Sequence, residues 1–203
     1  YVPNTSTIYS TGGPSPGYVA NHVAQMRFNG TVNGAIVFES SANTLTVMMQ
    51  FDVKGFQYAT TDAVADFTVS LYNYQNTSIL YASIIHRGPF RPQVRLARNS
   101  IDGLAVILGD ESTTDWQYSH FAITTMMHAH AGTQAFSQGW TATSGVTDLS
   151  GYDTLTTPTD KSLAQLASPT FTGVPIAPTA ANSTSSTQLA TTAFVQNVMG
   201  SGT

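Results

Sequence analysis

The sequence predicts an all-β fold: an antiparallel, jelly-roll-like β-sandwich, followed by an extended segment that several identical chains would stabilise together. Two observations carry this prediction. Short runs in which hydrophobic and polar residues alternate follow one another through the first 150 residues, and a long stretch rich in Ser, Thr, Ala and Pro comes after them. Alternation with a period of two is typical of strands that are buried on one face.

Seven hydrophobic runs make up the predicted sandwich, which we place at residues 18–150. Turn-forming pairs such as Asn33-Gly34, Gly88-Pro89 and Asp102-Gly103 separate the runs, and such pairs mark chain reversals. Many short strands divided by turns indicate an antiparallel sandwich. The predicted strands are Gly34–Phe38, Leu45–Val53, Phe67–Leu71, Ile79–Ile85, Val94–Leu96, Leu104–Leu108 and Phe121–Met127.

The segments on either side of the sandwich are expected to be connections. Residues 1–17 include the turn-rich run Gly12–Gly17, and we expect them to lead in from an upstream segment. Residues 151–162 are expected to form a linker. The extended segment then covers residues 163–200.

The extended segment has an unusual composition. From Thr154 to Thr203, half of the residues are Ser, Thr or Ala, and only Asp160 and Lys161 are charged. Prolines at 169, 175 and 178 argue against a central strand because proline has no N–H to donate. Such a composition is typical of a disordered linker, yet bulky apolar residues recur through it. These residues indicate a thin rod of identical chains: Leu163, Leu166, Phe171, Val174, Ile176, Leu189, Phe194, Val195 and Val198.

A short helix is predicted near the end of the chain. Ser185 and Gln188 have the spacing of a capping box, Ala190, Phe194 and Val198 repeat every four residues, and Gly200 would end the helix. A helix of roughly 12 residues is only marginally stable alone in water. Its apolar side chains therefore need a partner.

Composition excludes several classes of function. Charged residues make up only 9% of the chain and the net charge is −4, which gives no general attraction to nucleic acid. The absence of cysteine excludes disulfides, cysteine-bound zinc and thiol catalysis. No apolar stretch is long enough for a membrane helix, so we expect no membrane insertion. Asp110, Glu111 and Asp115 fit a solvated turn better than a glycosidase pair, and no enzyme is predicted.

Two blocks of the extended segment resemble a known repeat. Residues 167–181 and 187–196 resemble, almost position by position, the tail-fibre repeat of tailed bacteriophages, which also occurs in lambdoid side-tail fibres. The preceding region is similar to a β-rich domain of such fibres. That second similarity lies in Met48–Val53, Thr68–Tyr74, Leu104–Thr113 with Trp116, and Phe136–Trp140.

The resemblance implies a trimer and a role in infection. Three copies of Phe171, Val174 and Ile176, or of Phe194 and Val198, would meet on one axis. The expected function is a structural part of a phage tail fibre in the virion, made in the host cytoplasm, that serves host attachment and receptor recognition. Its expected partners are two further copies, other virion tail or fibre proteins, and a host glycan or outer-membrane receptor. The alternative is a carbohydrate-binding module that contacts host lipopolysaccharide or capsule directly.

A metal site is one interpretation of His128 and His130. A strand places residues i and i+2 on the same face, so both should share a face with His120 and Met126, opposite Phe121, Ile123 and Met127. By analogy with phage fibres that hold a metal between chains, three such pairs would offer octahedral coordination to iron or a similar ion. The alternative is a pair of histidines on the surface or in a groove of the sandwich, with no cofactor.

Two further clusters could contact a receptor. Arg87, Arg91, Arg95 and Arg98 could bind an anionic sugar or phosphate, or they could form ion pairs or protect an edge strand. Tyr72, Tyr74 and Trp116, with Tyr118 and Trp140, could stack on sugar rings, or could lie in a trimer interface. Tyr72 and Tyr74 should point away from Phe67, Val69 and Leu71.

Overall fold

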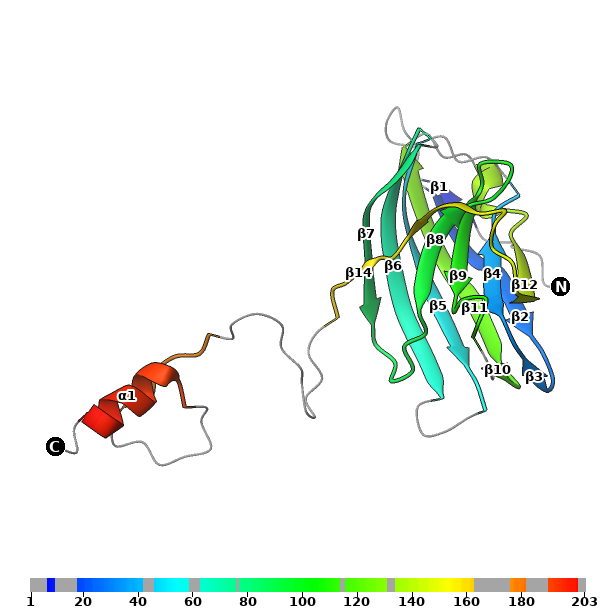
Figure 1. Cartoon of the computed structure of the whole chain (residues 1–203). Helices are drawn as coiled ribbons and strands as arrows, with labels where there is room; N and C mark the ends of the chain where they lie inside the picture. Colours follow the sequence, from blue (N-terminus) through cyan, green and yellow to red (C-terminus); the bar gives the residue numbers. More distant parts are fainter. Residues whose placement is uncertain are drawn as a thin grey trace. The chain divides into compact units, whose positions relative to one another are not determined.

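A computed structural model describes residues 7–9, 18–41, 46–58, 63–75, 77–113, 116–130, 134–162, 176–181 and 190–200 (Figure 1). The chain divides into two compact units, Tyr1–Ser162 and Leu163–Thr203. Most described residues of the first unit lie in β-strands, which confirms the predicted β-rich fold class.

The first unit contains two large sheets (Figure 1). Seven strands form one sheet, in the order β1 (Thr7–Tyr9), β2 (Tyr18–Arg27), β11 (His120–His130), β5 (Val47–Phe56), β6 (Val64–Tyr74), β7 (Ser78–His86) and β14 (Thr159–Asp160). Five strands form the other, in the order β12 (Thr141–Val146), β4 (Ala35–Glu39), β9 (Leu104–Leu108), β8 (Val94–Arg98) and β13 (Asp153–Thr156). β3 (Thr31–Val32) pairs with β10 (Trp116–Gln117). All pairs are antiparallel except β7 with β14.

The two large sheets share one hydrophobic core. β5 has the predicted alternation, with Val47, Met49, Phe51 and Val53 buried, and these residues pack in one cluster with Ile36 and other residues of the five-stranded sheet. Burying such large apolar side chains contributes roughly 1.5–3 kcal/mol each to stability. A second cluster, which includes Leu149, covers the other face of the five-stranded sheet and explains why every residue of β9 is buried.

All seven predicted runs are strands, but other strands were missed. β2 is ten residues long, yet its alternation breaks at His22, whose φ of 54° lies in the left-handed region. The expected linker at residues 151–162 is wrong, because β13 pairs with β8 and β14 pairs with β7. The expected lead-in at residues 1–17 likewise contains β1, which pairs with β2. These segments form strands because they pair with strands far away in the sequence, and a local hydrophobic pattern cannot predict such pairs.

A β-bulge in β11 overturns the predicted faces of that strand. Ile123 pairs with Val53 and Thr125 pairs with Asp52, so Thr124 is an extra residue on β11. One extra residue exchanges the two faces of everything that follows it. His128 therefore shares the buried face with Phe121, and not the face of His120, as strict alternation predicted.

The second unit contains the helix α1 (Thr192–Gly200). Thr191 caps its N-terminus, because the Thr191 Oγ1 accepts a hydrogen bond of 3.1 Å from the Phe194 N–H. The helix ends at Gly200, as predicted, but it begins after Ala190 and is shorter than expected. The predicted cap at Ser185 and the interface residues Phe171 and Val174 lie outside the described residues.

Candidate functional site

The predicted sugar contact at Trp116 is wrong. Trp116 is only 3% exposed, its indole N–H donates to the Gly34 carbonyl at 2.8 Å, and its ring packs edge-on against Phe90 and Phe121. Trp140 is buried in the same core and donates to a backbone carbonyl. Both indoles act as core residues, since a buried Trp needs a partner for its N–H.

Tyr72 and Tyr74 lie on the outer face of the seven-stranded sheet, as alternation predicted. Their rings are 5.8 Å apart, and Tyr74 is 41% exposed. Tyr72 pairs with Met48 on one side and Leu80 on the other, and both neighbours are exposed apolar residues. Exposed apolar side chains therefore flank Tyr72 on both sides.

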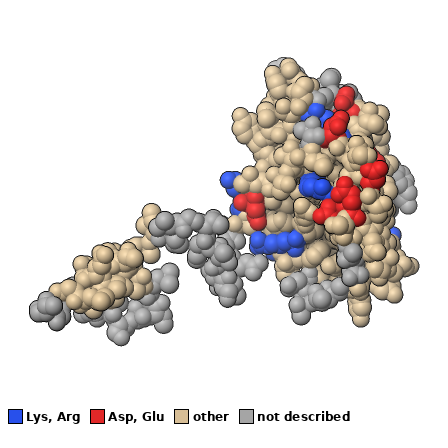
Figure 2. Space-filling view, in the orientation of Figure 1, with Lys and Arg blue, Asp and Glu red and all other residues tan. Residues whose placement is uncertain are grey.

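The four predicted arginines do not form one patch. Arg87 bonds with Asp52, Asp66 and Thr68. Arg91 pairs with Asp160 at 3.6 Å. Arg95 donates to the Gly109 carbonyl at 2.9 Å and pairs with Glu111 at 3.7 Å. Arg98 is buried and donates to Asn73 of the other sheet at 3.3 Å. Figure 2 likewise shows basic side chains next to acidic ones on the face in view, so the ion-pair interpretation is confirmed for Arg87, Arg91 and Arg95.

Arg95 also lies on the wrong side of the unit to join Tyr72. Arg95 pairs with Ile107, which belongs to the cluster on the outer face of the five-stranded sheet. Tyr72 lies on the outer face of the seven-stranded sheet. The predicted set of Tyr72, Tyr74, Trp116, Arg91 and Arg95 therefore does not converge on one site.

His128 is a core residue. It is 3% exposed and its ring packs edge-on against Phe136 with centroids 5.2 Å apart. Burial lowers the pKa of His128 from 6.5 to about 4, because a buried imidazolium loses its hydration. The structure thus places this imidazole in the core of one chain and not on its surface. The side chain of His130 lies outside the described residues, and those that are described contain no cluster of three metal-binding side chains.

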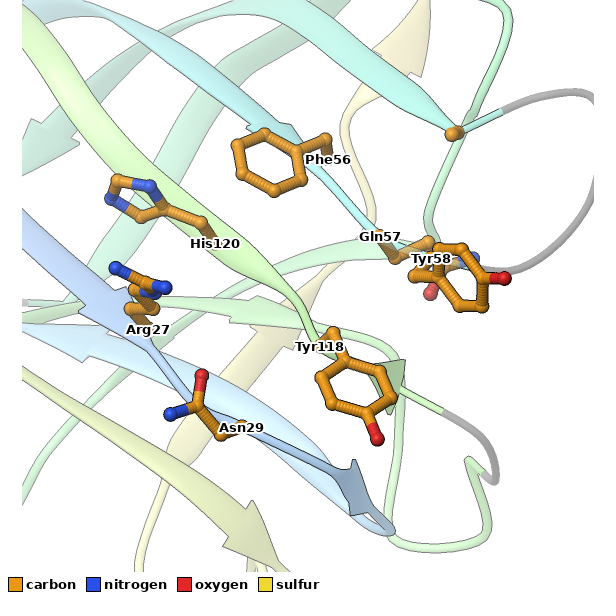
Figure 3. Close-up of a pocket in the computed structure, with 8 residues that line it drawn as sticks. Arg27, Asn29, Phe56, Gln57, Tyr58, Tyr118 and His120 are labelled. Carbon is orange, nitrogen blue, oxygen red and sulfur yellow. The ribbon is translucent and has the colours of Figure 1, made fainter.

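An open groove at one end of the seven-stranded sheet is the best candidate for a binding site (Figure 3). We call it the aromatic groove. It encloses about 790 Å³, within the usual range of roughly 300–1,000 Å³ for small-ligand sites. Its described lining consists of Arg27, Asn29, Phe56, Gln57, Tyr58, Ala63, Tyr118 and His120.

Strand register builds one wall of the groove. His120 of β11 pairs with Arg27 of β2 and with Phe56 of β5, so the three form a row across the sheet. The Phe56 and His120 rings meet edge-on at 5.7 Å. A smaller depression of about 400 Å³ shares Phe56 and His120 with the groove and extends it across the sheet surface.

Chain segments beyond the strands build the other wall. The Tyr58 N–H donates to the Gln117 carbonyl at 2.8 Å, and the Tyr118 N–H donates to the Gly30 carbonyl at 2.8 Å. These bonds bring the two tyrosine rings together edge-on at 6.0 Å. The arrangement offers flat apolar rings beside amide, imidazole and guanidinium donors, which together can bind a small polar ring.

Sequence patterns predicted little of this site. Its members come from β2, β5, β11 and the connections next to them, and Tyr58 and Tyr118 are far apart in the sequence. Tyr118 belonged to the predicted aromatic set, but Arg27, Phe56 and Tyr58 did not. A usable signal was the position of both tyrosines just outside predicted strands, where binding residues concentrate.

Comparisons with known proteins leave the family open. No family model, no curated protein and no solved structure matches this chain. Within the described parts of the chain, no helix has the length and apolar character needed to cross a membrane.

Proposed function

We propose that this chain is a segment of a homotrimeric phage tail fibre that serves attachment to a host cell. In this proposal the first unit is a jelly-roll-like β-sandwich and the second unit is an intertwined trimeric shaft. The observation that carries the proposal is the helix α1, which has no buried residue although Phe194, Val195, Val198 and Met199 lie along it.

The exposure of these side chains supports assembly. Ile176 is 96% exposed, Val198 42% and Met199 74%. Phe194 with Val198, and Val195 with Met199, are two pairs at i and i+4 that lie side by side on the helix. Apolar side chains that are this exposed gain stability when other copies cover them. The repeat-like sequence at residues 167–181 and 187–196 supports three copies in particular.

The first unit has a second exposed apolar surface. Met48, Tyr74, Leu80, Ile85 and Met127 are all at least 36% exposed, and strand pairing places Met48, Tyr72 and Leu80 in one row. Apolar surface gathered on one sheet face is typical of a protein contact. This supports contacts between copies, or with other fibre proteins, along the side of the fibre.

The mass of the purified chain in solution tests the proposal. Light scattering after size-exclusion chromatography should give three times the chain mass of 21.6 kDa. The double variant Phe194→Ser/Val198→Ser should shift the mass toward one chain, whereas Gln196→Ser in the same helix should not. A stable monomer that has a folded second unit would overturn the proposal.

In such a fibre, weak sites on three chains act together. Binding at a second site becomes intramolecular once the first is occupied, which raises avidity without any new contact. A trimer can therefore hold a cell surface through sites that are individually weak. The trimer would present three aromatic grooves, one on each chain.

A further inference from the structure

We propose that the aromatic groove binds an acidic saccharide, whose rings stack on Phe56, Tyr58 and Tyr118 and whose carboxylate or phosphate pairs with Arg27. The inference rests on the attachment role proposed above and adds the site and the ligand class. It commits to a sugar that carries negative charge.

Exposed aromatic rings make the first part of the argument. Phe56 is 50% exposed, Tyr58 74% and Tyr118 55%, and all three line the same groove. An aromatic ring offers a large rigid surface with few rotatable bonds, so that binding costs little side-chain entropy. The apolar C–H face of a sugar ring fits such a surface, while its hydroxyl groups need polar neighbours.

Polar donors and acceptors supply the second part. Asn29, Gln57 and His120 line the groove beside the rings (Figure 3). Amide side chains both donate and accept hydrogen bonds, as sugar hydroxyl groups do. A purely apolar protein segment would leave these groups without partners, whereas a saccharide would satisfy them.

The charge of the groove selects an acidic ligand. Arg27 is exposed and, among the described residues, is the only Lys, Arg, Asp or Glu that lines the groove. Within the described part of the chain Arg27 forms no ion pair, in contrast to Arg87, Arg91 and Arg95. A guanidinium group binds carboxylate and phosphate through paired hydrogen bonds.

The groove is also held in shape. Arg27, His120 and Phe56 lie in paired strands, and backbone hydrogen bonds hold Tyr58 and Tyr118. Tyr118 has a φ of 47°, a conformation that a bulky residue rarely adopts and that its surroundings must maintain. A preformed site loses less free energy on binding than a flexible one.

An array of bacterial saccharides, probed with the full chain in its native oligomeric state, tests the proposal. The array should contain saccharides with uronic or ulosonic acids, saccharides with sugar phosphates, and the carboxyl-reduced or dephosphorylated counterpart of each. We expect binding to acidic members and at least about tenfold weaker binding to their neutral counterparts. The two acidic groups distinguish carboxylate from phosphate as the preferred charge.

Matched variants locate the binding. Arg27→Gln should weaken binding to acidic members about tenfold and leave the weak binding to neutral members unchanged, and Tyr118→Ala should weaken both. Arg91→Gln and Tyr81→Ala alter an arginine that pairs with Asp160 and an 84% exposed tyrosine, neither of which lines the groove, and they should change neither.

Three results would overturn the proposal: no binding to any acidic saccharide, binding that survives both groove substitutions, or a groove substitution that changes the oligomeric mass. The last result would make the groove a contact between chains. A trimer that binds no saccharide would leave the fibre proposal standing, so the two proposals fail separately.

Discussion

The ring of Phe121 lies over Gly55 of the neighbouring strand, in the space where any other residue would carry a side chain. A Cβ atom added at Gly55 would overlap the Phe121 ring and come within 2.6 Å of the His120 carbonyl oxygen. The two residues are paired across β5 and β11, next to the row that builds the aromatic groove. The glycine is thus required by packing.

Replacing Gly55 by alanine should destabilise the first unit. The added methyl group would displace a fully buried ring, and overpacking of a core typically costs about 1–3 kcal/mol. Urea unfolding should show a lower midpoint with an unchanged slope. Gly151→Ala is the control, because nothing lies within 4 Å of a Cβ there. Equal midpoints for the two variants would contradict this packing.

Truncation of Trp116 should destabilise the fold far more than truncation of Tyr118. Trp116→Ala removes a buried ring and leaves the Gly34 carbonyl without its donor, so it should cost about 3–5 kcal/mol of folding stability. Tyr118→Ala removes a ring that is 55% exposed and should cost less than about 1 kcal/mol. Thermal unfolding of both variants checks this. A Trp116→Ala variant that is as stable as wild type would contradict the core role of this tryptophan.

His128 should make folding sensitive to mild acid. Its pKa is about 4 in the folded chain and about 6.5 when unfolded, so the unfolded state binds more protons between these values. Stability is therefore retained above pH 6.5 and falls as pH drops toward 4, by about 3 kcal/mol at most from this residue.

Unfolding measured from pH 7.5 to 4 in wild type and His128→Leu checks this contribution. The variant should lose less stability than wild type over the acidic part of the range. His22→Gln, which alters an exposed histidine, should retain the wild-type profile. Parallel pH profiles for wild type and His128→Leu would show that the imidazole is protonated without cost.

The cap at Thr191 should stabilise the second unit. Thr191→Ala removes the hydroxyl that accepts from the Phe194 N–H and should cost about 1 kcal/mol per chain. Circular dichroism during heating should show the helix melting earlier. Thr192 is the next residue, and its hydroxyl does not accept that hydrogen bond. Thr192→Ala should therefore have a smaller effect. Equal melting temperatures for the two variants would contradict Thr191 as the residue that caps the helix.

Local alternation was enough to find the strands that carry a regular hydrophobic pattern. β5 is the clearest case, because four alternate residues enter the core and nothing interrupts them. β2 was not predicted because its alternation breaks at His22, where the pairing with β11 shifts from Ala24 to Asn21. β12 was not predicted because Thr, Ala, Ser and Gly give it almost no hydrophobic pattern. β13 and β14 are short and depend on strands far away in the sequence.

The sequence by itself determined the β-rich class, the seven patterned strands and the helix that ends at Gly200, because hydrophobic period and capping chemistry are local properties. Only the tertiary structure decided which way side chains face after a bulge and which distant residues meet. One extra residue at Thr124 sends His128 into the core, and two backbone hydrogen bonds bring Tyr58 to Tyr118. Both depend on strand register, which non-local packing sets.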